Sequence, residues 1–117
     1  MKTQSAKAKG RKLQQWVRDK LIEKLDIDPQ DVESRSMGAG GEDIMMSAAA
    51  RSKFPYSIEC KNQERVNVYA SYKQACVNSG KHTPILIMKK NREDPLIVMD
   101  ALTFIELHGM IYANNGS

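Results

Sequence analysis

The segment 56–62 constrains the fold of this chain most strongly, because charged and apolar side chains alternate along it. Successive side chains of a β-strand point to opposite faces of the sheet. Ile58 and Cys60 therefore share one face, while Glu59 and Lys61 share the other. The pattern predicts a central strand with one buried apolar face and with an acidic and a basic side chain fixed side by side on the opposite face.

The remaining segments predict an α/β fold around this strand. We expect helices at about residues 6–25, 68–79 and 101–110, and strands at 31–36, 43–47, 56–62, 84–88 and 96–99. Residues 48–55 end in a proline and are expected to form an irregular connection. This order predicts a central mixed five-stranded sheet flanked by helices.

The first predicted helix has a clear amphipathic pattern. Its apolar stripe consists of Leu13, Val17, Leu21 and Leu25. Trp16 lies on the flank of this stripe, and we interpret it as a packing residue rather than as a platform for base stacking. Gln14 projects onto the stripe, so its amide lies either at the edge of the core or in a functional site.

The segment around Asp43 is expected to pair beside the central strand and to bring its carboxylate to Glu59 and Lys61. Three of the four residues 38–41 are glycines, which predicts a loop before it. Two carboxylates at one spot repel each other unless a cation lies between them. Glu59 and Lys61 alone could instead be an exposed ion pair, worth about a few tenths of a kcal/mol. The loop, the spacing and the buried opposite face favour a metal site.

Carboxylates that hold a divalent cation are typical of enzymes that hydrolyse phosphodiester bonds. In such a site, Asp43 and Glu59 would hold Mg²⁺ or Mn²⁺, and the backbone carbonyl of Cys60 would offer another oxygen ligand. The Lys61 ammonium would position the attacking water and offset the negative charge of the phosphate. The pattern therefore predicts a metal-dependent nuclease.

The charge distribution favours a polyanionic partner such as DNA. The net charge is +4, and the first twelve residues hold five basic side chains and no acidic one. We expect residues 1–9 to form a basic arm, although a solvated, frayed terminus would have the same composition. The candidate DNA contacts are Lys7, Lys9, Arg11, Lys12, Arg35, Ser36, Gln63 and Gln74, of which Gln74 could equally be a plain surface amide.

The length of 117 residues predicts a single domain over residues 1–117, with a frayed tail at about 113–117. No apolar run approaches the roughly 20 residues that would cross a membrane. No apolar core follows the basic start as it would in a secretory signal. Cys60 and Cys76 do not have the spacing of a disulfide framework or of a metal motif. We therefore expect a cytoplasmic protein of a bacterial, archaeal or phage-infected cell.

The chain resembles the PD-(D/E)xK nuclease superfamily, and within it the archaeal- and phage-type Holliday junction resolvases. Those proteins have a glycine-started first helix, an Arg-Ser loop rich in small residues, an Asp-Ile or Asp-Leu strand and then Glu-x-Lys. The matching residues are Gly10, Arg35-Ser36, Gly38, Asp43-Ile44 and Glu59-Cys60-Lys61. The likeness covers about residues 7–80 and implies a restriction-endonuclease-like nuclease core.

Carried over by position, the resemblance implies that Asp43 and Glu59 are metal ligands and that Lys61 is the catalytic lysine. It implies paired, symmetric nicks in four-way DNA junctions. It also implies a homodimer, because a junction with two-fold symmetry needs two active sites. The candidate interface residues are Met45, Met46 and the apolar parts of the last two strands and of the C-terminal helix.

Gln14 departs from the family pattern, which has a glutamate at this place. The amide keeps an oxygen ligand but carries no charge, which implies weaker metal binding unless Glu23 or Glu42 contributes. Two alternatives therefore stay open beside the junction resolvase. One is a nuclease that acts on nicks, flaps or plain duplex DNA. The other is a DNA-binding module of the same fold that has lost efficient cleavage.

Overall fold

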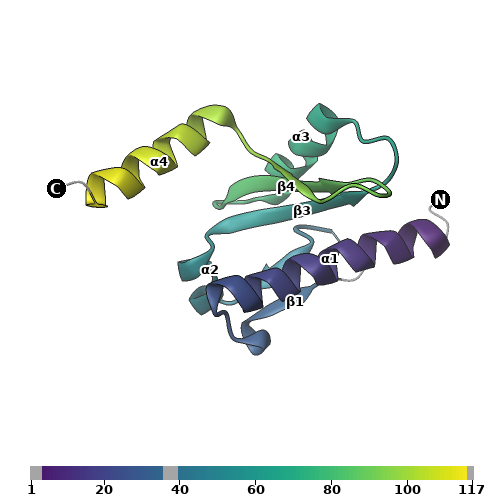
Figure 1. Cartoon of the computed structure of the whole chain (residues 1–117), viewed down its shortest axis with the longest axis horizontal. Helices are drawn as coiled ribbons and strands as arrows, with labels where there is room; N and C mark the ends of the chain where they lie inside the picture. The colour runs from purple at the N-terminus through teal and green to yellow at the C-terminus, as the bar shows by residue number, and fades with distance from the viewer. Residues whose placement is uncertain (1–3, 36–39, 116–117) are drawn as a thin grey trace.

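The structure is a computed structural model, and it describes residues 4–35 and 40–115 (Figure 1). The elements are α1 (Gln4–Leu25), a 3₁₀ turn (Pro29–Asp31), β1 (Val32–Ser34), β2 (Ile44–Met46), α2 (Ala48–Lys53), β3 (Tyr56–Asn62), α3 (Val68–Asn78), β4 (Thr83–Lys89), β5 (Leu96–Val98) and α4 (Ala101–Asn115). The fold is α/β, as predicted. In the described part of the chain, every helix is too short or too polar to cross a membrane.

The described strands form two sheets, so the expected single five-stranded sheet is wrong. β1 and β2 pair antiparallel in one sheet. In the other sheet β3 pairs parallel with β4, and β5 pairs antiparallel with β4. The reason lies in the connection between β2 and β3, because a helix occupies it where an irregular segment was expected. Strands that are joined through a helix need not continue one antiparallel ladder.

This connecting helix, α2, corrects the expectation of an irregular segment at 48–55. Ser47 is its N-cap, and the Ser47 hydroxyl accepts a hydrogen bond from the Ala50 N–H at 3.1 Å. Three alanines, which are the best helix formers, follow the cap. Pro55 lies two residues after the last helical residue, Lys53, so it limits the helix without preventing it.

The two terminal helices are longer than expected. Helix α1 begins at Gln4, so Lys7 and Lys9 of the expected basic arm lie on this helix. Helix α4 continues to Asn115, past the predicted end at residue 110 and into the segment expected to be frayed. In Figure 1, α4 projects away from the two sheets, whereas α1 lies along β3.

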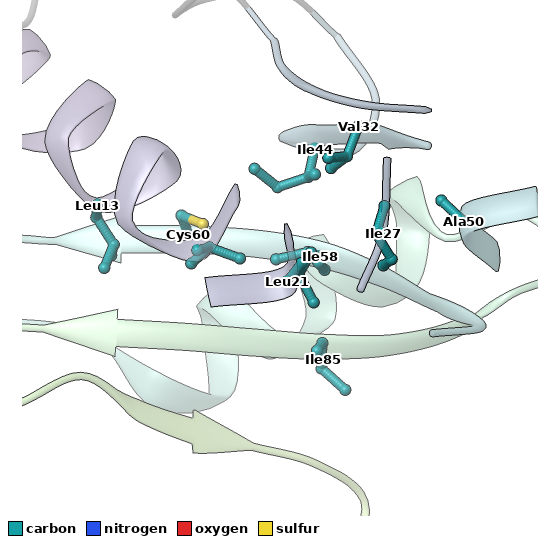
Figure 2. Packing of buried hydrophobic residues seen from close by; sticks show 10 residues of the cluster. Leu13, Leu21, Ile27, Val32, Ile44, Ala50, Ile58, Cys60 and Ile85 are labelled. Carbon is teal, nitrogen blue, oxygen red and sulfur yellow. The ribbon is translucent and has the colours of Figure 1, made fainter. Parts of the chain in front are cut away.

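The hydrophobic core lies between α1 and one face of the sheets (Figure 2). Leu13, Val17 and Leu21 are each at most 6% exposed, whereas Leu25 is 36% exposed, so the buried stripe ends one turn earlier than predicted. The buried partners on the strands are Val32, Ile44, Ile58, Cys60 and Ile85. Burying a side chain of this size contributes about 1.5–3 kcal/mol. This core covers the Ile58 and Cys60 face of β3 and leaves the Glu59 and Lys61 face to α3.

Candidate active site

Asp43 lies at the point where the chain entering β2 meets β3. Its N–H donates to the Ile58 carbonyl at 2.9 Å, and its Oδ2 accepts a hydrogen bond from the Cys60 N–H at 2.7 Å. A carboxylate thus satisfies a strand N–H that would otherwise need a backbone acceptor. The contact fixes the Asp43 carboxylate directly beside the Glu-Cys-Lys tripeptide.

Glu59 is a buried carboxylate, only 4% exposed, with donors from two elements. Asn78 of α3 donates from Nδ2 to Oε1 of Glu59 at 3.3 Å. The Lys61 ammonium lies 3.9 Å from Oε2, and the two side chains are 18% and 5% exposed. The alternative of an exposed surface ion pair is therefore wrong. An ionised carboxylate this deeply buried requires such partners.

The thiol of Cys60 lies close to both carboxylates. Burial raises the pKa of this thiol well above its usual value, and the negative charges of Asp43 and Glu59 raise the pKa further. Its side chain packs in the core with Leu13 and Ile58, away from the Glu59 face of β3 (Figure 2). The two carboxylates therefore flank one peptide unit of β3, and the thiol itself is a core group.

Gln14 lies in the interior of the protein. It is 3% exposed, and α1 packs against β1 and β3 on the side that carries Gln14 and Leu13. Its burial is compatible with both positions that the sequence left open, the edge of the core and a functional site. Its participation in the site stays a prediction, which a charge substitution can test.

In Gln14→Glu, we expect divalent metal to bind about tenfold more tightly or better, because a third carboxylate joins the donor set. Without metal, the added buried charge should lower the melting temperature. The measurement is the melting temperature in EDTA and along a Mn²⁺ titration. Gln15→Glu is the matched control, because Gln15 is exposed and only donates to the Ser34 hydroxyl at 2.9 Å. Equal metal responses of the two variants would place Gln14 outside the site.

The two acids considered as additional ligands are engaged elsewhere. The Glu42 carboxylate forms an ion pair with Arg51 of α2. Arg35 donates from Nε to the Glu42 carbonyl at 2.7 Å. Glu23 is exposed on α1 and pairs with neighbouring lysines. Glu42 is thus held by α2 and Glu23 lies on the surface, and a contribution of either to metal binding stays a prediction.

The donor chemistry fits a hard divalent cation. Such cations prefer oxygen ligands, and the carboxylates of Asp43 and Glu59 flank the Cys60 peptide, whose carbonyl is a further oxygen. Among the described residues, no three His, Cys, Asp or Glu side chains are grouped as a metal site. Two carboxylates supplemented by neutral oxygens are thus the donor set that the described chain offers.

The predicted DNA contacts lie in different parts of the fold. Those on the N-terminal half of α1 are Lys7, Lys9, Arg11 and Lys12. Arg35 lies beside the Asp43 segment, because its backbone N–H donates to the Asp43 carbonyl at 2.7 Å. Gln63, after β3, and Gln74, on α3, are exposed. Ser36 lies outside the described residues.

Asn78 and Arg51 support the site, although the sequence analysis did not single them out. Asn78 is the last residue of α3 and lies one turn beyond Gln74, and it holds Glu59. Arg51 holds Glu42 and also donates to the Tyr56 carbonyl at 3.2 Å. The strand–helix–strand order could have pointed to Asn78, because a helix that joins two parallel strands must cover one face of them.

A comparison with known families decides the assignment. The family model described as "Phage putative PDDEXK endonuclease" matches residues 5–110. The chain belongs to this family. The predicted PD-(D/E)xK superfamily of phage type is therefore confirmed, and the match extends past the end of the predicted likeness at about residue 80. Searches of the curated proteins and of the solved structures gave no match. Membership in a PD-(D/E)xK endonuclease family supports a nuclease with DNA as substrate and a divalent metal ion as the general cofactor.

Proposed function

We propose that this PD-(D/E)xK protein is an Mg²⁺- or Mn²⁺-dependent endonuclease that cuts branched DNA, with the four-way junction as its substrate. The hydrolytic part rests on one observation above all. The Asp43 carboxylate is hydrogen-bonded to the Cys60 N–H at 2.7 Å, and the ammonium of Lys61 lies 3.9 Å from Glu59 on the same strand. Two acids and one lysine thus lie around the Glu59-Cys60-Lys61 segment of β3.

In this proposal the metal is held by Asp43 and Glu59, with neutral oxygens from Gln14 and from the Cys60 carbonyl. The bound ion supplies activation of a water and stabilisation of the charge on the departing oxygen. Lys61 is 18% exposed, so its ammonium is accessible to the water and the phosphate that it orients. Asn78 is a positioning residue, because its amide fixes the Glu59 carboxylate.

Preference for branched DNA rests on the resemblance to junction resolvases and on the basic face of α1. Cleavage of nicks, flaps or plain duplex is the alternative within the same chemistry. A binding module without cleavage is the alternative outside it. The test incubates the purified protein with labelled junction, flap and duplex DNA in Mg²⁺, Mn²⁺ or EDTA. Paired, symmetric nicks confined to the junction support the proposal. Equal cutting of duplex, or junction binding without cutting in either metal, contradicts it.

The proposed homodimer rests on the exposed apolar surface of β5 and α4. The exposed large apolar side chains here are Leu96, Ile97, Leu102, Phe104, Ile105, Met110, Ile111 and Tyr112. They lie on several sides of α4, which projects from the body of the protein (Figure 1). A helix that is apolar on all sides is normally buried.

The exposed area supports a second copy of the chain as the occupant of this surface. The accessible surface is 7996 Å². A compact monomer of 13.2 kDa would expose roughly 6,400 Å². The excess of accessible surface over this value is larger than the roughly 800 Å² that each partner buries in a standard interface. Obligate homodimers bury more than a standard interface does. Because β5 is an open edge strand joined directly to α4, two copies could pair there around a two-fold axis.

In Ile105→Asp, we expect the dimer to dissociate at least about tenfold more readily, because the carboxylate would be buried without a partner. The measurement is sedimentation equilibrium over a concentration series. Tyr69→Asp is the matched control, because Tyr69 is 84% exposed on α3 and away from this surface. A wild-type protein that stays monomeric throughout the series would contradict the proposed dimer.

A further inference from the structure

A cleft of about 590 Å³ is lined by residues of α1 and by residues at the carboxyl ends of the parallel strands β3 and β4. One wall is the face of α1 that carries Lys9, Lys12 and Trp16. The other wall is formed by Asn62 at the end of β3 and Lys89 at the end of β4, together with the hairpin that follows. The carboxyl ends of strands are the usual place for ligands in open α/β sheets.

The walls are held together by a specific contact close to the proposed catalytic residues. Asn62 donates from Nδ2 to the Lys9 carbonyl at 2.9 Å. Asn62 directly follows Lys61 on β3, and alternation along the strand sends its side chain to the α1 side. Lys61 itself points to the opposite face, so the cleft and the proposed catalytic lysine lie on the two sides of the same strand end.

Trp16 is the single tryptophan of the chain, and it is 42% exposed in this cleft. The buried stripe of α1 thus leaves much of the ring uncovered, so packing does not account for the whole side chain. The ammonium of Lys20 lies 6.0 Å from the centre of the ring. An exposed indole flanked by lysines is a typical platform for an unpaired base, whereas a base within a duplex already has both faces covered.

The charges around the ring favour a phosphate-bearing ligand. Lys9, Lys12 and Lys89 line the cleft, opposed by Asp19 and Asp94. A shallower hollow on α1 shares Lys9 and Lys12 with the cleft and adds an arginine, with no acidic side chain in its lining. Positive charge therefore continues from the cleft along α1, as expected for the path of a nucleic-acid backbone.

We propose that this cleft binds an unpaired nucleotide of single-stranded DNA, with its base stacked on Trp16 and its flanking phosphates on Lys12 and Lys89. The proposal rests on the proposed endonuclease function and adds an element of substrate choice to it. A branched or partly opened substrate supplies such a nucleotide next to the cut, and a continuous duplex does not. The cleft would favour the former.

The single tryptophan makes the proposal directly measurable. The full-length protein in EDTA is titrated with a short oligothymidylate, and indole fluorescence is recorded alongside the anisotropy of a labelled copy of the oligonucleotide. We expect the fluorescence to be quenched over the same concentration range as the rise in anisotropy, and both to shift to higher concentration with added salt. Binding without quenching, or no binding, would overturn the proposal.

Single substitutions distinguish binding in the cleft from a general effect of positive charge on DNA binding. Trp16→Ala should weaken binding of the oligothymidylate roughly tenfold by anisotropy, and Lys89→Ala several-fold. Lys73→Ala is the matched control, because Lys73 is exposed on α3 and does not line the cleft. Wild-type affinity in both cleft variants would overturn the proposal. If the oligothymidylate quenches Trp16 but the protein cuts no DNA in any metal, the endonuclease function is wrong and the cleft proposal stands. If the protein cuts DNA but the oligothymidylate does not quench Trp16, the cleft proposal alone is wrong.

Discussion

Asp43→Asn should reduce the rate of metal-dependent DNA cleavage by at least about 100-fold while leaving the fold intact. The asparagine oxygen can still accept the hydrogen bond from the Cys60 N–H, so the contact at 2.7 Å survives. The substitution removes one of the two carboxylates in the proposed donor set. Both metal affinity and catalysis should therefore fall, which single-turnover cleavage at increasing Mn²⁺ concentrations would measure.

The stability of the same variant gives an independent readout. In EDTA, its melting temperature should equal or exceed that of the wild type, because the repulsion between Asp43 and Glu59 is relieved. The stabilisation by added metal should become smaller. Glu33→Gln is the matched control, since Glu33 is an exposed carboxylate on β1. Wild-type cleavage by Asp43→Asn would show that the site is assigned to the wrong residues.

The sequence predicted those elements whose pattern is local. The alternation of residues 56–62 gave the bounds of β3 correctly, since Tyr56–Asn62 is the observed strand. The buried stripe of α1 was right for Leu13, Val17 and Leu21. Helix α2 was missed because its basic residues and Pro55 were weighted above the Ser47 cap. The division into two sheets depends on how β2 packs relative to β3, and no local pattern specifies that packing.

The site was predictable where its residues follow one strand, and less so where packing brings elements together. Glu59 and Lys61 share a face because of strand alternation alone. Asn78 contacts Glu59 only because α3 packs on β3, and in the sequence it is indistinguishable from a polar helix end. Similarly, the sequence suggested Arg35 only as a phosphate contact, and its hydrogen bond to the Glu42 carbonyl became visible only in the fold. Long polar side chains can serve either purpose, and tertiary contacts decide between them.

Lys61→Met should also slow cleavage by at least about 100-fold, but with the opposite effect on metal binding. Methionine keeps an unbranched apolar stem and removes only the ammonium that lies 3.9 Å from Glu59. In the proposed site, this ammonium and the metal ion would both neutralise the same buried carboxylate. Without the ammonium, the buried carboxylate keeps the Asn78 amide but loses this nearby positive charge, so we expect the metal to bind at least as tightly as in the wild type.

The two substitutions therefore separate the roles of ligand and catalyst. Asp43→Asn should lose cleavage and metal-induced stabilisation together, whereas Lys61→Met should lose cleavage and keep or increase the stabilisation. The measurement is the rise in melting temperature with Mn²⁺, compared with single-turnover rates on the same DNA. Lys73→Ala, on the exposed side of α3, controls for the loss of one positive charge. A weaker metal response in Lys61→Met would mean that the lysine helps to build the metal site, and its assignment as the group that acts on water and phosphate would be wrong.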